Sequence, residues 1–425
     1  MIRRTCFILL ALGFATAFST SAAAQAEEPI EPSGSRPATP AELGFTGSPA
    51  EIRRQAEAIA EKGSWGRPSP TDIKTIKEMA AGTPEPLADP FDLALLAQRI
   101  KEAGEIGDSD LLRSHPARSI SALDSEPQGT ASGWSSGDLP GLEIAPNCRN
   151  SGQRIRLYYV YRHGYQPTEA WEGLQPWSSI ARANTKFLFE SALSSENERV
   201  VTLNVECYPP GHVLAGYPTI RTVLTTPVPS DGELSLNDVY SSFEQRRNQV
   251  EGTTNKVVDL AFYAEGGISP GGLGGPNVFH DPSRVRRDER SANYWNFEQK
   301  TAMVQRDRWT TDTVVHELLH TFGAVAWDHP LSTGDSHCLV KFDLMCGNGG
   351  PRGYLFPVVS PPECPDTLPA GRRIDCLEAI YFRADHGDGT FLDWWLDERW
   401  NTIGAENRFV EAYPEWDYSV PCSKC

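Results

Sequence analysis

His316, Glu317 and His320 have the residue types and the spacing of the zinc-binding motif His-Glu-x-x-His. On a helix, residues four positions apart lie one above the other, so both imidazoles can occupy corners of one tetrahedral zinc ion. Glu317 then lies close enough to take a proton from a metal-bound water without being a ligand. The alternative is two core histidines on a buried helix, but with 9 His among 425 residues this pattern would rarely arise by chance. We therefore predict a Zn2+ site with Glu317 as the general base.

The motif requires a helix, and the sequence marks both ends of one. Residues 310–312 are Thr-Thr-Asp, which can cap and place negative charge in a first turn, and Gly323 can end the helix. Apolar residues recur on one side of the expected helix, at Val315, Leu318, Leu319 and Phe322. This side is expected to hold the helix in a core while the histidines point elsewhere.

A catalytic zinc site needs a third protein ligand and a fourth position for water. Our choice for the third ligand is His329, because Asp328 and Pro330 can orient and stiffen a loop that turns back over the metal. Asp328 is a rival, since a carboxylate can bind zinc or support a ligand through a hydrogen bond. His337 is the other rival, and beside Cys338 it could instead donate a hydrogen bond to a developing oxyanion.

The N-terminus has the pattern of a secretory signal peptide. Residues 1–4 are basic, residues 6–18 are apolar, and the small residues at 21–26 offer cleavage sites after Ala24 or Ala26. With residues 1–24 as the signal peptide, we expect a secreted protein, extracellular or periplasmic. No later stretch is apolar for long enough to span a membrane. The net charge of −17 argues against a nucleic-acid partner, and the oligomeric state is left open.

The number and positions of the cysteines also indicate an exported protein. Loss of the signal peptide would leave eight of the 9 cysteines, all at or after Cys148, which is typical of disulfide-bonded exported proteins. Spacing favours the local pairs Cys338 with Cys346 and Cys364 with Cys376. The sequence leaves open the pairing of Cys148, Cys207, Cys422 and Cys425.

Residues 25–140 differ from the rest of the chain, with no Cys, many Pro, Ala and Glu, and few large apolar residues. Capping and stop signals predict short helices within 48–63, 69–82 and 89–104. Two interpretations are open: a pro-segment that folds against the catalytic domain and is removed on maturation, or a solvated spacer. We favour the pro-segment, with the Ser- and Gly-rich residues 125–141 as linker and processing site.

Residues 145–425 form the predicted catalytic domain. Strand patterns at 155–161, 200–205 and 257–263 alternate with helical patterns at 177–195 and 236–247, which indicates an α/β (α+β) fold. The six glycines of 266–275 lack the GxxxxGK[ST] pattern of a phosphate loop, so we interpret them as a flexible rim near the catalytic cleft. After Gly323 we expect an irregular lobe stapled by the local disulfides, with one clear helix from about Phe391.

The zinc helix, followed by a Gly, a nearby third ligand and a downstream Met, resembles the metzincin clan of zinc endopeptidases. The chain more closely resembles a group of secreted bacterial, peptidase-like HExxH proteins over roughly residues 150–410. The matching features are Gly-Ala-Val at 323–325, His329, His-Cys at 337–338, and Asp-Leu-Met-Cys at 343–346. The resemblance implies a mixed sheet with a backing helix and a zinc helix, and a turn that places Met345 beneath the metal. The chain departs from the clan at Ala326, where metzincins have their third His, and from the group at Gly347, where Tyr often follows the turn.

These features predict a secreted zinc-dependent endopeptidase that acts on protein or peptide substrates. Its zinc ligands would be His316, His320 and His329, with Glu317 as the catalytic base. One alternative is a secreted zinc-containing binding or adhesion protein without hydrolytic activity, although such a site has no use for the carboxylate of Glu317. A zinc hydrolase acting on another amide or ester is a third possibility.

Overall fold

A computed structural model describes the parts of the chain that form the sheet and its covering helices. These are residues 36–59, 70–81, 142–152, 154–193, 200–251, 257–270, 272–274 and 300–322, with residues 324, 337, 343–345, 374 and 410–413. All of them belong to one compact unit that runs from Gly34 to Cys425. The predicted third N-terminal helix at 89–104 and the helix expected from Phe391 lie outside the described residues.

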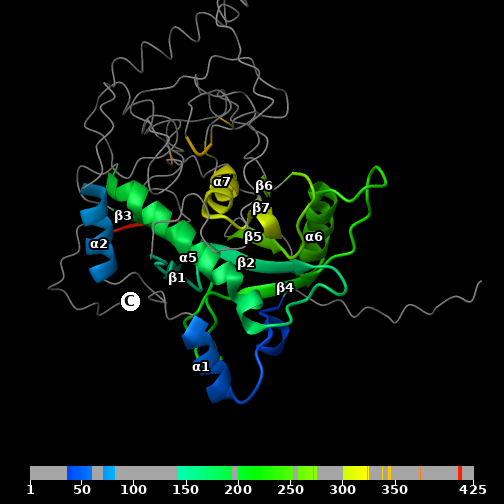
Figure 1. The fold of residues 1–425 in the computed structure, drawn as a ribbon, viewed down its shortest axis with the longest axis horizontal. Coiled ribbons are helices and arrows are strands. Elements are labelled where there is room, and N and C mark those ends of the chain that lie inside the picture. Colours follow the sequence, from blue (N-terminus) through cyan, green and yellow to red (C-terminus); the bar gives the residue numbers. More distant parts are fainter. Residues whose placement is uncertain are drawn as a thin grey trace, which may run out of the picture. The chain divides into compact units, whose positions relative to one another are not determined.

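The centre of the unit is an eight-stranded mixed sheet (Figure 1). The strands are β1 (Asn147–Cys148), β2 (Arg154–Tyr161), β3 (Val200–Val205), β4 (Ile220–Leu224), β5 (Val257–Tyr263), β6 (Gly272–Gly274), β7 (Lys300–Gln305) and β8 (Val410–Tyr413). Their order is β1-β3-β2-β5-β7-β6, with β4 also pairing with β2 and β8 with β3. The pairs β6–β7 and β3–β8 are antiparallel and the others are parallel. The predicted mixed α/β architecture is therefore confirmed at this level.

Helices cover both faces of the sheet, as expected where parallel strands are apolar on both sides. On β2, Tyr159 lies in the core cluster shared with α5 (Ala170–Leu193) and α7 (Thr311–Phe322). The next residue back, Tyr158, lies in the opposite cluster with Phe243 of α6 (Leu236–Glu251). Because side chains alternate along β2, α5 and α7 lie on one face of the sheet and α6 lies on the other (Figure 1).

Helix α5 is the predicted backing helix, but it begins earlier than expected. The helical pattern predicted from the sequence begins at Trp177. In the structure Pro176 lies inside the helix, which starts at Ala170. The added turns pack closely against the N-terminal segment, since a Cβ on Gly173 would lie 2.5 Å from the Leu43 carbonyl oxygen. This tertiary contact has no local sequence signal.

The described part of the N-terminal segment folds against the central sheet and α5. It comprises the 3₁₀ helix η1 (Ala41–Leu43), α1 (Pro49–Ile59) and α2 (Pro70–Ala81). The Ser48–Glu51 capping box begins α1 as predicted, with Ser48 N donating to Glu51 Oε2 at 2.6 Å. Leu43 and Phe45 are buried in the main core, and Ala38 N donates to the Ile220 carbonyl of β4 at 2.8 Å. These residues therefore pack against the core, and the choice between pro-segment and spacer stays a prediction.

Removal of the segment on maturation stays a prediction. The packing of the segment raises the free-energy cost of removing it. Loss of residues 36–59 would expose core side chains of the sheet and of α5 to water, at roughly 25 cal/mol for each Å² of apolar surface. N-terminal sequencing of the exported protein decides the question. A first residue near position 25 would show that the segment is retained.

A disulfide joins Cys148, at the end of β1, to Cys207, just after β3, with a Cα–Cα distance of 5.4 Å. The sequence left open the pairing of four cysteines, and this disulfide identifies the partners of two of them. The bond is compatible with an oxidising compartment. The predicted pairs Cys338–Cys346 and Cys364–Cys376 lie outside the described residues. Export itself stays a prediction.

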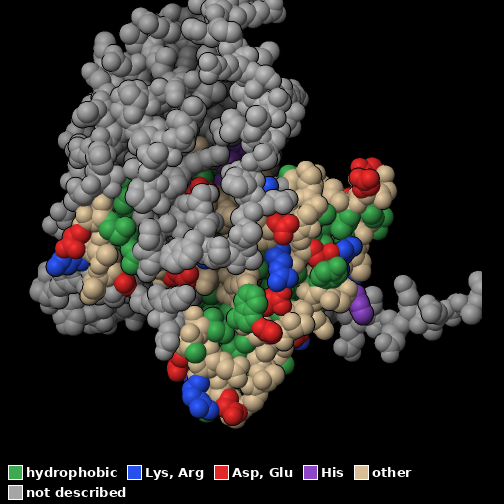
Figure 2. Space-filling model, viewed as in Figure 1, with side chains coloured by type: hydrophobic (Ala, Val, Ile, Leu, Met, Phe, Trp, Pro, Cys, Tyr) green, Lys and Arg blue, Asp and Glu red, His purple; other side chains and the backbone are tan. Residues whose placement is uncertain are grey.

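Within the part of the chain that the structure describes, no helix combines the length and the apolar character needed to cross a bilayer. On the face that Figure 2 presents, basic and acidic side chains of the described residues are interspersed rather than gathered into regions of one sign. The expectation that no nucleic acid binds is not tested further by these observations.

Candidate metal centre

Helix α7 carries the His-Glu-x-x-His motif and has the boundaries that the sequence predicts. Thr310 is its N-cap, since the Thr310 hydroxyl accepts a hydrogen bond from Thr313 N at 3.2 Å. The helix ends at Phe322, and Ala324 N bonds back to the Leu319 carbonyl at 2.9 Å. That bond satisfies a carbonyl that the end of the helix would otherwise leave without a partner.

Two contacts fix α7 against the rest of the domain. Lys186 of α5 is almost fully buried and pairs with Asp312 in the first turn of α7. At the other end of α7, the rings of Phe187 and Phe322 meet edge to face, with centroids 6.2 Å apart. The sequence analysis did not single out Lys186, although a lysine inside the apolar stripe of a predicted helix signals a buried ion pair. Together these contacts set the helix that bears the motif on its backing helix.

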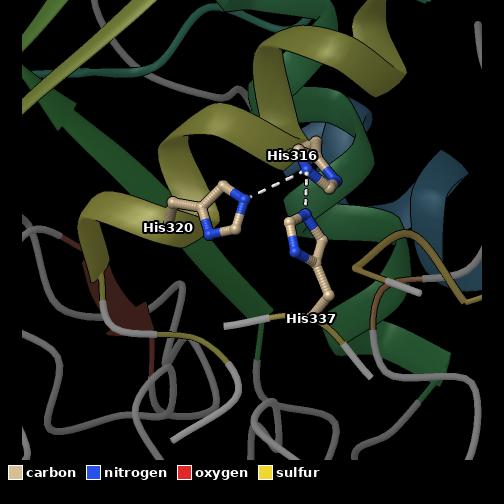
Figure 3. A group of neighbouring side chains, drawn as sticks. All are labelled: His316, His320 and His337. Atoms are coloured by element: carbon tan, nitrogen blue, oxygen red, sulfur yellow. Dashed lines mark hydrogen bonds between the residues drawn. The ribbon is translucent and has the colours of Figure 1, made fainter. Parts of the chain in front are cut away.

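The structure brings three histidine side chains together: His316, His320 and His337 (Figure 3). His316 Nε2 lies 3.1 Å from His320 Nε2 and 3.3 Å from His337 Nε2, and the possible ligand atoms all lie within 4.8 Å of one another. Two nitrogens bound to one tetrahedral zinc ion at about 2.0–2.1 Å would lie about 3.3 Å apart. The spacing of the three Nε2 atoms therefore suits a single metal ion of this size.

The proton positions also favour a cation between the three rings. His316 Nδ1 lies 2.8 Å from the Leu344 carbonyl oxygen. A carbonyl only accepts, so Nδ1 carries the proton and the Nε2 of a neutral His316 presents a lone pair. Two other Nε2 atoms approach this single lone pair, more than it can accept as good hydrogen bonds. A bound cation would satisfy all three nitrogens at once.

His320 is the deepest of the three ligand candidates. Burial, followed by the proximity of His316 and His337, holds the pKa of His320 well below its ordinary value. The ring is therefore neutral at neutral pH and its Nε2 is available to a metal. Its Nδ1 is buried without a hydrogen-bond partner among the described residues, whereas metal-binding histidines usually donate from this position. His316 and His337 are half-buried, which leaves one side of the cluster partly accessible.

The third histidine of the cluster is His337, which the sequence analysis ranked behind His329. His329 and Asp328 lie outside the described residues, so neither is placed relative to the cluster. His329 and His337 both follow α7 closely enough for a loop to bring either one back to the helix. Only the path of the chain decides which of them reaches His316 and His320. The rings of His316 and His337 stack with their centroids 5.2 Å apart. The spacing of the two residues along the sequence could not predict this contact.

The turn at Asp343–Met345 lies beside the cluster and supports it. Asp343 and Met345 are fully buried, and Asp343 Oδ1 accepts a hydrogen bond from Met345 N at 2.7 Å. This side-chain turn holds the intervening Leu344 carbonyl, which receives the His316 Nδ1–H. Met345 joins the main core, and its place beneath a metal stays a prediction.

Replacement of Asp343 by alanine is expected to weaken zinc binding by about 10- to 100-fold, the usual effect of removing a partner that orients a metal ligand. The physical reason is that the Leu344 carbonyl would lose the turn that aims it at His316. Asp343→Asn keeps an acceptor oxygen for Met345 N and serves as the matched control. Competition titration with a chromophoric chelator measures both affinities, and equal weakening in the two variants would contradict the turn-setting role.

Glu317 lies beside His316 in the helix and is buried. Burial raises the pKa of its carboxyl group to about 8, and a nearby cation would lower it again. The carboxylate also lies against the glycine-rich strand β6, because a Cβ on Gly272 would be 2.4 Å from Glu317 Oε1. Three residues of the predicted glycine-rich rim, Gly272–Gly274, form strand β6, which lies next to the motif.

Comparisons with protein families, with curated proteins and with solved structures find no match to this chain.

Proposed function

We propose that this protein is an exported zinc-dependent endopeptidase of the metzincin type, with His316, His320 and His337 as the zinc ligands. The observation that carries the proposal is the convergence of three histidines, with Nε2 atoms of His320 and His337 at 3.1 and 3.3 Å from that of His316, beside the buried carboxylate of Glu317. Three imidazole nitrogen donors suit zinc. A ligand set of three side chains also leaves the fourth position that catalytic zinc sites keep for water, whereas structural zinc sites are closed.

Zinc bound there would lower the pKa of its water ligand to about 7 and polarise a peptide carbonyl. The role of Glu317 is to accept the proton of that water and return it to the leaving amine. Burial raises the pKa of this carboxyl group, and a cation bound at the histidines would lower it, which would leave the carboxylate able to accept a proton. His320, neutral through burial, contributes a lone pair and no competing proton.

The strand next to the site supports a peptide as substrate. In the described part of the chain β6 pairs with β7 alone, so it is an edge strand. An extended peptide can add to such an edge through backbone hydrogen bonds, which favours unfolded or loop segments of proteins as substrates. The proximity of β6 to Glu317 would bring the backbone of that peptide to the catalytic residues.

Incubation of the purified, zinc-loaded protein with unfolded casein tests the proposal. Cleavage that stops with a chelator, with new amino termini identified by mass spectrometry, supports a metalloendopeptidase. Retention of one zinc per chain without cleavage of peptides would instead favour the binding or adhesion protein. Cleavage of small esters or amides but not of peptides would favour another zinc hydrolase.

A further inference from the structure

Two glycines of β6, Gly272 and Gly274, lie against α7. Their register partners on β7 are Val304 and Ala302, whose side chains belong to the core beneath α5 and α7. Leu273, between the two glycines, packs against the cluster on the opposite face of the sheet. Because side chains alternate along a strand, a side chain at position 272 or 274 would point toward α7.

A methyl group at each glycine would meet a different part of α7. At position 272 the Cβ would lie 2.4 Å from Glu317 Oε1 and 2.9 Å from its Cδ. At position 274 it would lie 2.5 Å from the Cβ of His320 and 2.8 Å from the backbone oxygen of Glu317. A carboxylate can rotate away from such a contact, whereas a Cβ and a backbone carbonyl move only with the helix.

We propose that Gly272 is the positioning residue for the Glu317 carboxylate, and that Gly274 sets the separation of β6 from the metal-binding helix. This inference rests on the proposed function. Because residue 272 has no side chain, the Glu317 carboxylate can occupy the space between β6 and the histidine cluster. A larger residue there displaces the base and leaves the histidine ligands in place.

Gly272→Ala is expected to lower kcat on casein-derived peptides by about 100-fold, the effect of displacing a catalytic group by about 1 Å. Zinc stoichiometry and KM stay at their wild-type values, because neither the ligands nor the strand edge changes. Gly274→Ala is expected to lower both the zinc affinity and the Tm, since the helix itself must shift. Unchanged kcat in Gly272→Ala would overturn the positioning role.

Gly266→Ala is the matched control for the loss of a glycine. Its Cβ would lie 2.0 Å from Asp307 Oδ1, so it creates a clash with a carboxylate of the same kind outside the His cluster. This variant is expected to lose stability and to keep the wild-type kcat at temperatures where it is folded. A fall in kcat equal to that of Gly272→Ala would show that any strain in this segment impairs the enzyme, and would overturn the specific role of Gly272.

A thermal stability cycle in the Glu317→Ala background tests the contact without relying on activity. Gly272→Ala is expected to lower the Tm of the wild type and to have much less effect once the Glu317 side chain is absent. Gly274→Ala is expected to lower the Tm by nearly the same amount in both backgrounds, because its two closest contacts, the His320 Cβ and the Glu317 backbone oxygen, remain and only the looser 3.1 Å contact with Glu317 Oε2 is lost. Equal Tm losses for Gly272→Ala in both backgrounds overturn the inference. The two proposals can fail separately. If the wild type cleaves no peptide but the stability cycle shows coupling between Gly272 and Glu317, the proposed function is refuted and the contact is established.

Discussion

Replacement of Glu317 by alanine is expected to lower kcat by about 100- to 10,000-fold while one zinc ion stays bound, the range that general acid–base catalysis contributes. Glu317 lies in α7 beside His316, and its carboxylate is buried next to β6. The zinc ligands in this account are the three histidines, so removal of the carboxylate leaves all of them in place.

Glu317→Gln is the matched variant, since it keeps the shape of the side chain and removes its basicity. Both variants should bind zinc as tightly as the wild type in a chelator competition and cleave casein with similarly low kcat. Wild-type kcat in either variant contradicts the role of Glu317 as base. Loss of zinc from both would instead make Glu317 part of the metal site.

The His337→Ala substitution is expected to weaken zinc binding by more than about 100-fold, beyond the usual effect of losing an orienting partner. His337 Nε2 lies 3.3 Å from His316 Nε2, the separation expected of two ligands on one zinc ion. Loss of this ring leaves two protein donors, fewer than catalytic zinc sites use. Zinc titration of the purified variants measures the effect.

Two further histidine variants complete that titration. His329→Ala tests the ligand that the sequence favoured, and in this account it binds zinc as tightly as the wild type. His163→Ala, which removes an exposed histidine after β2, controls for weak surface binding. If His329→Ala releases zinc while His337→Ala retains it, the ligand set proposed here is wrong and the sequence-based choice is right.

The sequence predicted the parts of the site that depend on local signals. The spacing of His316 and His320, the cap at Thr310 and the end of α7 all lie within one helix and follow from helix geometry. The third histidine could not be chosen in this way. Positions 329 and 337 are both within reach of a loop, and the path of that loop depends on packing far from it in sequence.

Long-range contacts account for the other differences between expectation and structure. The Cys148–Cys207 disulfide spans 59 residues and follows from the parallel pairing of β1 with β3, for which no local pattern exists. The closeness of Gly272 to Glu317 arises because β6 folds back antiparallel to β7. The glycine content predicted proximity to the site, but only the strand register shows which glycine meets the base.

The central claim is that zinc held at the three-histidine cluster makes this protein a peptidase. Its most direct test is a titration of the chelator-treated protein with zinc while casein cleavage is followed by release of new amino groups. The account predicts that cleavage is absent without zinc, rises linearly with added zinc, and reaches a plateau at one equivalent per chain. Cleavage that persists after complete zinc removal, or one tightly bound equivalent of zinc that restores no cleavage, would contradict it.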